Sequence, residues 1–164
     1  MTQRAATAHH DIALSVPRHW VTHADPEQAI ALAARAPRRL ASGFAPELVL
    51  RAVLVPGDPG QWRTRALVAP GSGLEQFEVE EIDGDDELSG RPVGYRRFGH
   101  RVGGVAVVCD QWVWVDDGVG VTFTGSVARA DYADYADVFE SIAATIEVTP
   151  VARPGSAPRG EGRS

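Results

Sequence analysis

The sequence has no lysine and no asparagine among its 164 residues, so all sixteen basic side chains are arginines. A chain without lysine cannot form a Schiff base and has no lysine to contact phosphate in a P-loop. A chain without asparagine has no N-glycosylation acceptor. The absences exclude these chemistries and are typical of a protein encoded by a GC-rich bacterial genome.

Cysteine occurs once, at Cys109. A single cysteine excludes an internal disulfide and any zinc or iron–sulfur site that needs several thiolates. Cys109 lies among valines in a predicted strand, where burial raises the pKa of a thiol and makes it a poor nucleophile. We therefore interpret Cys109 as an inert core residue.

Acidic residues outnumber basic ones, and the formal net charge is −6. This excess disfavours binding to nucleic acid or to an anionic membrane, because both carry negative charge. No segment approaches the ~20 apolar residues of a membrane span, and the first residues lack the apolar stretch of a signal peptide. We therefore expect a cytoplasmic protein that does not insert into membranes.

The length and the apolar content of 44% are typical of one globular domain. We place a single α+β domain at residues 11–148. Residues 1–10 are predicted to be a disordered leader. Residues 149–164, rich in proline, glycine, serine and arginine, are predicted to be a disordered tail.

Strands dominate the prediction for the first half of the chain. Residues 12–16 alternate with period two, and residues 47–55 form an apolar run typical of a strand buried on both faces. Residues 27–36 fit either a helix or a strand, with the strand narrowly preferred, and residues 61–68 also fit both. Residues 77–82 are predicted to form a short, charged edge strand.

The second half predicts two long antiparallel strands joined to a third. Residues 92–101 are predicted to form one strand, residues 105–115 alternate with period two, and a turn between them contains two glycines. Asp116-Asp117-Gly118 is a strong hairpin signal before a further strand at residues 119–124, because glycine readily adopts the positive φ of such turns.

Beyond the hairpin the hydrophobic period becomes helical, and one stripe carries Tyr135, Val138, Phe139, Ile142 and Ile146. Asp131, Asp134 and Asp137 occur at every third position in this segment. At about 100° per residue their carboxylates spread over an arc, so they do not converge on one metal ion or one reacting atom. We interpret Asp131 as the N-cap and Asp134 as a first-turn carboxylate favoured by the helix dipole.

The histidines are scattered along the sequence. His19 and His23 are four residues apart, but no third ligand lies near them, so no metal site is predicted. His9 and His10, in the predicted leader, do not suggest a site either. No catalytic residue and no cofactor is assigned.

Asp110 lies in an otherwise apolar strand and needs a partner, because an unpaired buried carboxylate is costly. Arg96 or Arg97 on the preceding strand is the expected partner in a cross-strand ion pair. Gly71–Gly73 is predicted to be a loop, and Asp83–Glu87 a solvated turn rather than a calcium site. Arginines that could gather into an anion-binding patch are interpreted as surface charge: Arg35, Arg38, Arg39, Arg63 and Arg65.

Two tryptophans, Trp112 and Trp114, share one face of a predicted strand. Core packing is the default for such side chains, but if the face is partly open the two indoles form an interaction surface. The candidate contact surface therefore consists of Trp20, Trp112, Trp114, Arg96 and Arg97.

Short motifs occur in a characteristic order along the chain. Pro17-Arg18-His19-Trp20 closes the first strand, and Phe44-Ala45-Pro46-Glu47 opens a later one. Gly90-Arg91-Pro92-Val93 precedes the two long strands, and residues 121–126 precede a helix that ends at Ser141-Ile142. In this order the motifs resemble the Mog1/PsbP-like superfamily and, within it, most closely the actinobacterial LpqN/LpqT lipoprotein group.

The resemblance implies a curved antiparallel β-sheet flanked by helices, an α/β/α sandwich, and a protein that binds without catalysis. Glu47 stands where the family has asparagine, and the lipoprotein signal with its lipid-bearing cysteine is absent, so the resemblance does not carry over an envelope role. The superfamily has no common catalytic residues to carry over.

Our hypothesis is a soluble binding or accessory module with a protein partner. One alternative is a carrier of a small apolar ligand held between sheet and helix. A second is a small hydrolase-like enzyme that pairs His19, His23 or His100 with a carboxylate.

Overall fold

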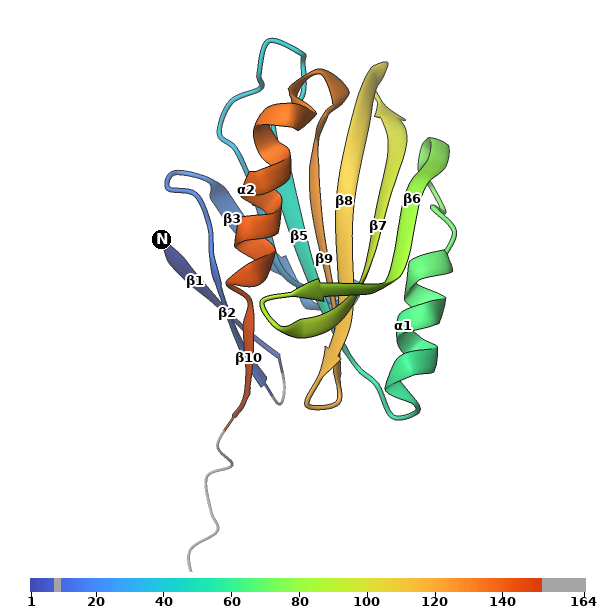
Figure 1. Cartoon of the computed structure of the whole chain (residues 1–164). Coiled ribbons are helices and arrows are strands. Elements are labelled where there is room, and N and C mark those ends of the chain that lie inside the picture. Colours follow the sequence, from blue (N-terminus) through green and yellow to red (C-terminus); the bar gives the residue numbers. More distant parts are fainter. Residues whose placement is uncertain (8–9, 152–164) are drawn as a thin grey trace, which may run out of the picture.

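The computed structural model describes residues 1–7 and 10–151, and an antiparallel seven-stranded sheet forms its centre (Figure 1). In spatial order its strands are β3 (Val21–Asp25), β4 (Ile30–Arg35), β5 (Glu47–Leu54), β9 (Val119–Ala128), β8 (Val105–Asp116), β7 (Arg91–Val102) and β6 (Glu75–Leu88). A second, three-stranded sheet consists of β1 (Thr2–Ala6), β2 (His10–Ser15) and β10 (Glu147–Pro150), with β2 in the middle. The helices are α1 (Pro59–Val68) and α2 (Tyr132–Ala144), with short 3-10 turns η1 (Pro26–Gln28) and η2 (Arg129–Asp131).

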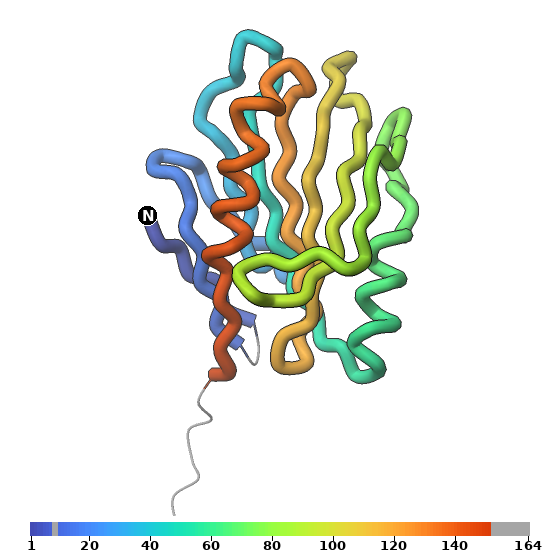
Figure 2. Tube along the Cα trace, in the orientation of Figure 1, coloured from blue at the N-terminus to red at the C-terminus, as the bar shows by residue number. Residues whose placement is uncertain are grey.

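The large sheet has two faces, which we name after the helices that pack on them. Helix α2 and the small sheet cover the α2 face, whereas α1 packs on β6–β9 of the α1 face (Figures 1 and 2). The predicted α+β architecture, an antiparallel sheet flanked by helices, is confirmed. In the described part of the chain, no helix has the length and apolar character needed to cross a membrane.

Glycines bring the helices close to the sheet. A side chain at Gly125 would overlap the Phe139 ring of α2, and one at Gly120 would overlap the Trp62 indole of α1. Helix α1 begins where Asp58 accepts a hydrogen bond from the Gln61 backbone N–H at 3.0 Å, directly before Pro59. This cap selects the helix over the strand for residues 61–68.

The main core fills the α2 face. Trp112 and Trp114 project into it and are only 4% and 1% exposed, so they cannot belong to an open contact surface. They pack with side chains from both sheets and from α2, including Ile12, Leu14, Leu48, Leu50, Phe123 and Phe139.

Several local expectations need correction. The predicted disordered leader contains strand β1, because Thr2–Ala6 pairs with β2 and buries Ala5 against it. The predicted tail begins at residue 149, yet Thr149 and Pro150 end strand β10, and residues 152–164 lie outside the described residues. Asp83–Glu87 is not a turn but part of β6, held by pairing with β7.

Strand β5 is buried on one face only. Leu48 and Leu50 point to the α2 face and are fully buried, whereas Arg51 and Val53 point to the α1 face and are exposed, because that face carries no helix here. The expectation of burial on both faces is therefore wrong. Residues 27–36 divide between the η1 turn and strand β4, which agrees with the preference for a strand.

Helix α2 begins at the predicted position but is not capped as predicted. Asp131 occupies the N-cap, yet its Oδ2 accepts a hydrogen bond from the Ser42 hydroxyl at 2.5 Å, and its side chain makes no cap bond. Asp131 thereby joins α2 to the loop between β4 and β5. Phe139 and Ile142 lie on the buried stripe, and Ile146 is buried just beyond the helix end.

Candidate functional site

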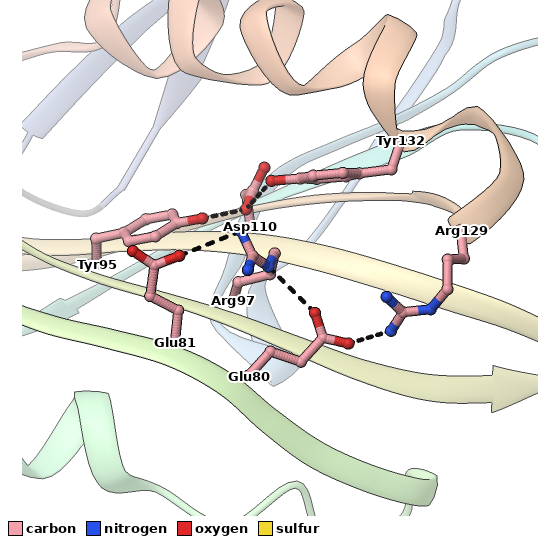
Figure 3. A network of polar contacts seen from close by, with 7 residues as sticks. All are labelled: Glu80, Glu81, Tyr95, Arg97, Asp110, Arg129 and Tyr132. Atoms are coloured by element: carbon pink, nitrogen blue, oxygen red, sulfur yellow. Dashed lines mark hydrogen bonds and ion pairs between the residues drawn. The ribbon is translucent and has the colours of Figure 1, made fainter.

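A network of ionisable side chains lies on the α2 face, where β6, β7 and β8 meet the start of α2 (Figure 3). At its centre the buried Asp110 carboxylate accepts hydrogen bonds at Oδ1 from two phenols. The Tyr95 hydroxyl of β7 donates at 2.5 Å, and the Tyr132 hydroxyl, from the first residue of α2, donates at 3.0 Å. One carboxylate thus ties two strands and a helix together.

Arginine side chains surround this centre without pairing with Asp110. Arg97 is the register partner of Asp110 on β7, but its guanidinium contacts Glu80 at 3.1 Å and Glu81 at 3.2 Å (Figure 3). Arg129 donates a further hydrogen bond to Glu80. The predicted ion pair between Asp110 and Arg96 or Arg97 is therefore wrong, because the phenols take the place of the arginine.

The electrostatics of the centre follow from its burial. Burial raises the pKa of the Asp110 carboxyl, against hydrogen bonds from Tyr95 and Tyr132 that lower it. Burial and the hydrogen bond to Asp110 raise the pKa of Tyr95, so this phenol stays protonated as a donor. Both hydroxyls are engaged with the carboxylate, and the arrangement holds α2 on the sheet rather than presenting a nucleophile or a base.

Arg96 projects to the opposite, α1 face and is buried. Its Nε donates to the Gln111 Oε1 at 2.7 Å, and its Nη1 donates to the carbonyls of Leu67 at 3.1 Å and Ala69 at 2.8 Å. These carbonyls belong to the last turn of α1 and the residue after it, so Arg96 caps the helix. The guanidinium also lies 5.0 Å from the centre of the Phe98 ring.

Cys109 lies on the same face, buried as predicted. Its Sγ is 3.1 Å from the Ser126 hydroxyl. Burial raises the pKa of this thiol to about 12, so it is almost entirely protonated at neutral pH. An inert core thiol is consistent with this environment.

The histidines are not brought together. His19 lies in an exposed turn, His23 on β3 and His100 on β7, and among the described residues none of the three pairs with a carboxylate. Burial lowers the pKa of His100. The described residues contain no group of three or more His, Cys, Asp and Glu side chains that could hold a metal ion.

One histidine–carboxylate contact in the structure was not predicted from the sequence. The buried His10 places its Nε2 3.2 Å from the Asp117 carboxylate, at the tip of the β8–β9 hairpin. Period-two alternation with Ile12 and Leu14 was the available signal that His10 faces inward. The contact joins the small sheet to the hairpin. Among the described residues, no further acidic, basic or nucleophilic side chain hydrogen-bonds to these two side chains.

An open groove of about 470 Å³ lies on the α1 face, over the three strands that α1 does not reach. We call it the β3–β5 groove, and its lining includes Val21, His23, Ile30, Ala33, Pro37 and Val49. Arg35, paired with Glu47 at 2.6 Å, lines one end, beside the loop that carries Arg38 and Arg39. Of the five arginines considered as a patch, these three lie together, whereas Arg63 and Arg65 belong to α1.

The predicted contact surface is thus dispersed over the molecule. Trp112 and Trp114 are core, and Arg96 is buried on the other face. Trp20 is partly buried against the main core, and Arg97 lies in the network around Asp110. The groove was not predicted from the sequence. The positions that line it alternate along each strand with positions in the main core, so the pattern of each strand alone is typical of a core strand.

Comparisons with known proteins identify the fold. No protein-family profile matches the chain, and no curated protein matches it. The structure of LpqN from Mycobacterium tuberculosis, a protein involved in cell envelope biogenesis, superposes with a TM-score of 0.60 at 15% identity and covers 92% of this chain and 91% of LpqN. Cyanobacterial PsbP from Synechocystis superposes with a TM-score of 0.57 at 17% identity over 90% of this chain and 92% of its own. The chain has the Mog1/PsbP-like fold.

A third solved structure extends the comparison. A Pseudomonas aeruginosa protein of unknown function matches with a TM-score of 0.56 at 14% identity, covering 94% of this chain and 99% of its own. The resemblance inferred from the short motifs is therefore confirmed for the fold. At these sequence identities the similarity establishes the architecture only, and no functional role of a residue is transferred to this chain.

Proposed function

We propose that this protein is a non-catalytic module that binds a protein partner in the β3–β5 groove. The observation that carries the proposal is the uncovered part of the α1 face. Val21, at the outer end of the groove, is 64% exposed, and the floor is formed by Ala33 and Val49. An apolar groove with an exposed apolar residue at its end and a charged margin is a common arrangement at protein interfaces.

The other surfaces of the sheet support this choice. On the α2 face, α2 and the small sheet bury the tryptophans, and the Asp110 network uses its polar groups internally. Catalysis needs groups whose polar atoms are free to meet a substrate. The buried Asp110 and Arg96 instead serve helix attachment and helix capping.

The dimensions of the cavities favour a protein over a small ligand. A recess of about 220 Å³ between β1 and β4 is lined mainly by alanines, and it is smaller than the roughly 300–1,000 Å³ of typical ligand pockets. The larger β3–β5 groove is open along the sheet, whereas a carrier encloses most of its ligand. The carrier hypothesis is therefore less well supported.

Photo-crosslinking in the native host tests the proposal. Val21 in the groove and Val68 on α1 are both 64% exposed, so they form a matched pair. We expect benzoylphenylalanine at Val21, but not at Val68, to yield a defined protein adduct. Equal adducts at both positions, or none at either, would contradict the proposal. A small molecule found with the purified protein by native mass spectrometry would favour the carrier.

A further inference from the structure

We propose that the partner segment is an extended, acidic stretch of chain that adds to the edge strand β3 as an eighth strand and lays alternate side chains in the β3–β5 groove. This inference rests on the proposed function and specifies the chemistry of the partner. Three features support it: the character of the two sheet edges, the charge beside β3 and the continuity of the edge with the groove.

The two edges of the large sheet differ. More than half of the residues of β6 are acidic, and its pairing with β7 is interrupted by three register irregularities. Charge and bulges are devices that prevent strands from adding to an edge. At the other edge, β3 carries one carboxylate, Asp25 at its end, and no arginine, its pairing has one register irregularity, between His23 and Asp25, and it pairs with β4 alone. The outer side of β3 therefore offers unpaired backbone donors and acceptors to an incoming strand.

Positive charge gathers beside β3. Val21 pairs with Arg35, so the turn before β3 and the loop after β4 lie at the same end of the sheet. This end carries Arg18 from the turn, and Arg38 and Arg39 from the loop, all exposed. In the described part of the chain none of these three has a carboxylate within ion-pair distance. In a chain of net charge −6, such a cluster favours a negatively charged partner.

The edge and the groove form one surface. Val21 and His23 of β3 lie on the α1 face with Ala33 of β4 and Val49 of β5, and all four line the groove. Side chains of a strand alternate between faces, so every second residue of an added strand would point to this side. The expected segment therefore has apolar residues at alternate positions and carboxylates near Arg38 and Arg39.

A protein segment fits these features better than nucleic acid does. Single-stranded nucleic acid is bound by a basic groove together with aromatic side chains on which bases stack. The lining of the groove includes no Phe, Tyr or Trp, and Trp20 is partly buried in the main core. Backbone pairing along β3 requires a polypeptide.

Peptide binding to the full-length protein tests the inference. The probe is a fluorescent peptide of alternating valine and aspartate or glutamate. Its controls are the same peptide with N-methylated backbone amides, a valine–lysine peptide and a single-stranded oligonucleotide. We expect binding by the acidic peptide alone, with amide shifts by NMR on β3 and β4 rather than on β6. Equal binding of the N-methylated or the lysine peptide, preferential binding of the oligonucleotide, or shifts confined to β6 would overturn the inference.

Charge reversal gives a matched pair of variants. Arg38→Glu with Arg39→Glu should weaken acidic-peptide binding by about tenfold or more, because it reverses the charge that the peptide meets. Arg63→Glu with Arg65→Glu on α1 changes the net charge equally and should leave binding within about twofold. Equal losses in both double variants, with unchanged thermal melting, would contradict the charge argument. A protein adduct at Val21 without acidic-peptide binding would sink this inference and leave the proposed function standing.

Discussion

The Asp110 network predicts a specific difference between two substitutions at one position. Asp110→Ala removes the carboxylate that accepts hydrogen bonds from the Tyr95 and Tyr132 hydroxyls. A hydrogen bond to a charged group is worth about 1.5–3 kcal/mol, so two such bonds give an upper bound of about 3–6 kcal/mol. Both tyrosines are only partly buried, so water replaces part of the loss, and we expect a destabilisation of about 2–4 kcal/mol.

Asp110→Asn keeps an acceptor oxygen of the same shape. We expect its free energy of unfolding at pH 7 to lie within about 1 kcal/mol of the native value, because both phenols still have a partner and no charge is buried. Tyr132→Phe is the matched control, since it removes one of the two hydrogen bonds. Its destabilisation should fall between those of the alanine and asparagine variants.

The pH dependence has a definite sign. The pKa of Asp110 is raised by folding, so the folded chain binds more protons than the unfolded chain at this position. The stability that this group contributes is fully present below the ordinary aspartate pKa of about 4 and is lost as the pH rises through the raised value. The Asp110→Asn chain lacks this loss, so its stability relative to the native chain should increase with pH across that window.

Denaturant unfolding followed by tryptophan fluorescence measures these differences, because Trp112 and Trp114 are buried in the folded chain. The measurement is repeated from pH 4 to pH 8. The reasoning fails if the asparagine variant is as unstable as the alanine variant. It also fails if the difference between the asparagine variant and the native chain does not change with pH.

Three further outcomes are expected. Gly125→Ala should cost about 1–3 kcal/mol in thermal or denaturant unfolding, because its methyl group overlaps the Phe139 ring, whereas Gly57→Ala, with open space around it, should be near neutral. Cys109 should react with a thiol reagent at pH 8 only after denaturation, and fast labelling of the folded chain would show that the thiol is accessible. Arg96→Leu should destabilise by about 1–3 kcal/mol and lower the helical circular dichroism signal, since it leaves the last carbonyls of α1 without a donor; an unchanged spectrum and midpoint would refute the capping role.

Local patterns account for most of what the sequence predicts correctly. The β8–β9 hairpin is specified without help from distant residues. Val105–Asp116 alternates with period two, and the two turn residues, Asp117 and Gly118, both have positive φ. The 3.6-residue stripe of α2 is equally local. These elements need only neighbouring side chains, and the sequence shows those directly.

The features that decide the candidate sites are long-range. Tyr132 reaches Asp110 across 22 residues of sequence, and helix packing, which no periodicity reveals, brings them together. The direction of Arg97 likewise depends on Glu80 in a strand whose bulges shift its register. The groove exists because α1 stops short of β5, and strand patterns do not show where a helix lies on a sheet.

The three-stranded sheet has a consequence for how the chain is made. Its central strand β2 precedes every strand of the large sheet in the sequence, yet one of its partners, β10, follows all of them and is translated later. Until β10 pairs with β2, the side chains of Ile12 and Leu14 are only partly buried, and chaperones or other nascent chains can contact them. Pairing of β10 with β2 should therefore follow translation of all the strands of the large sheet.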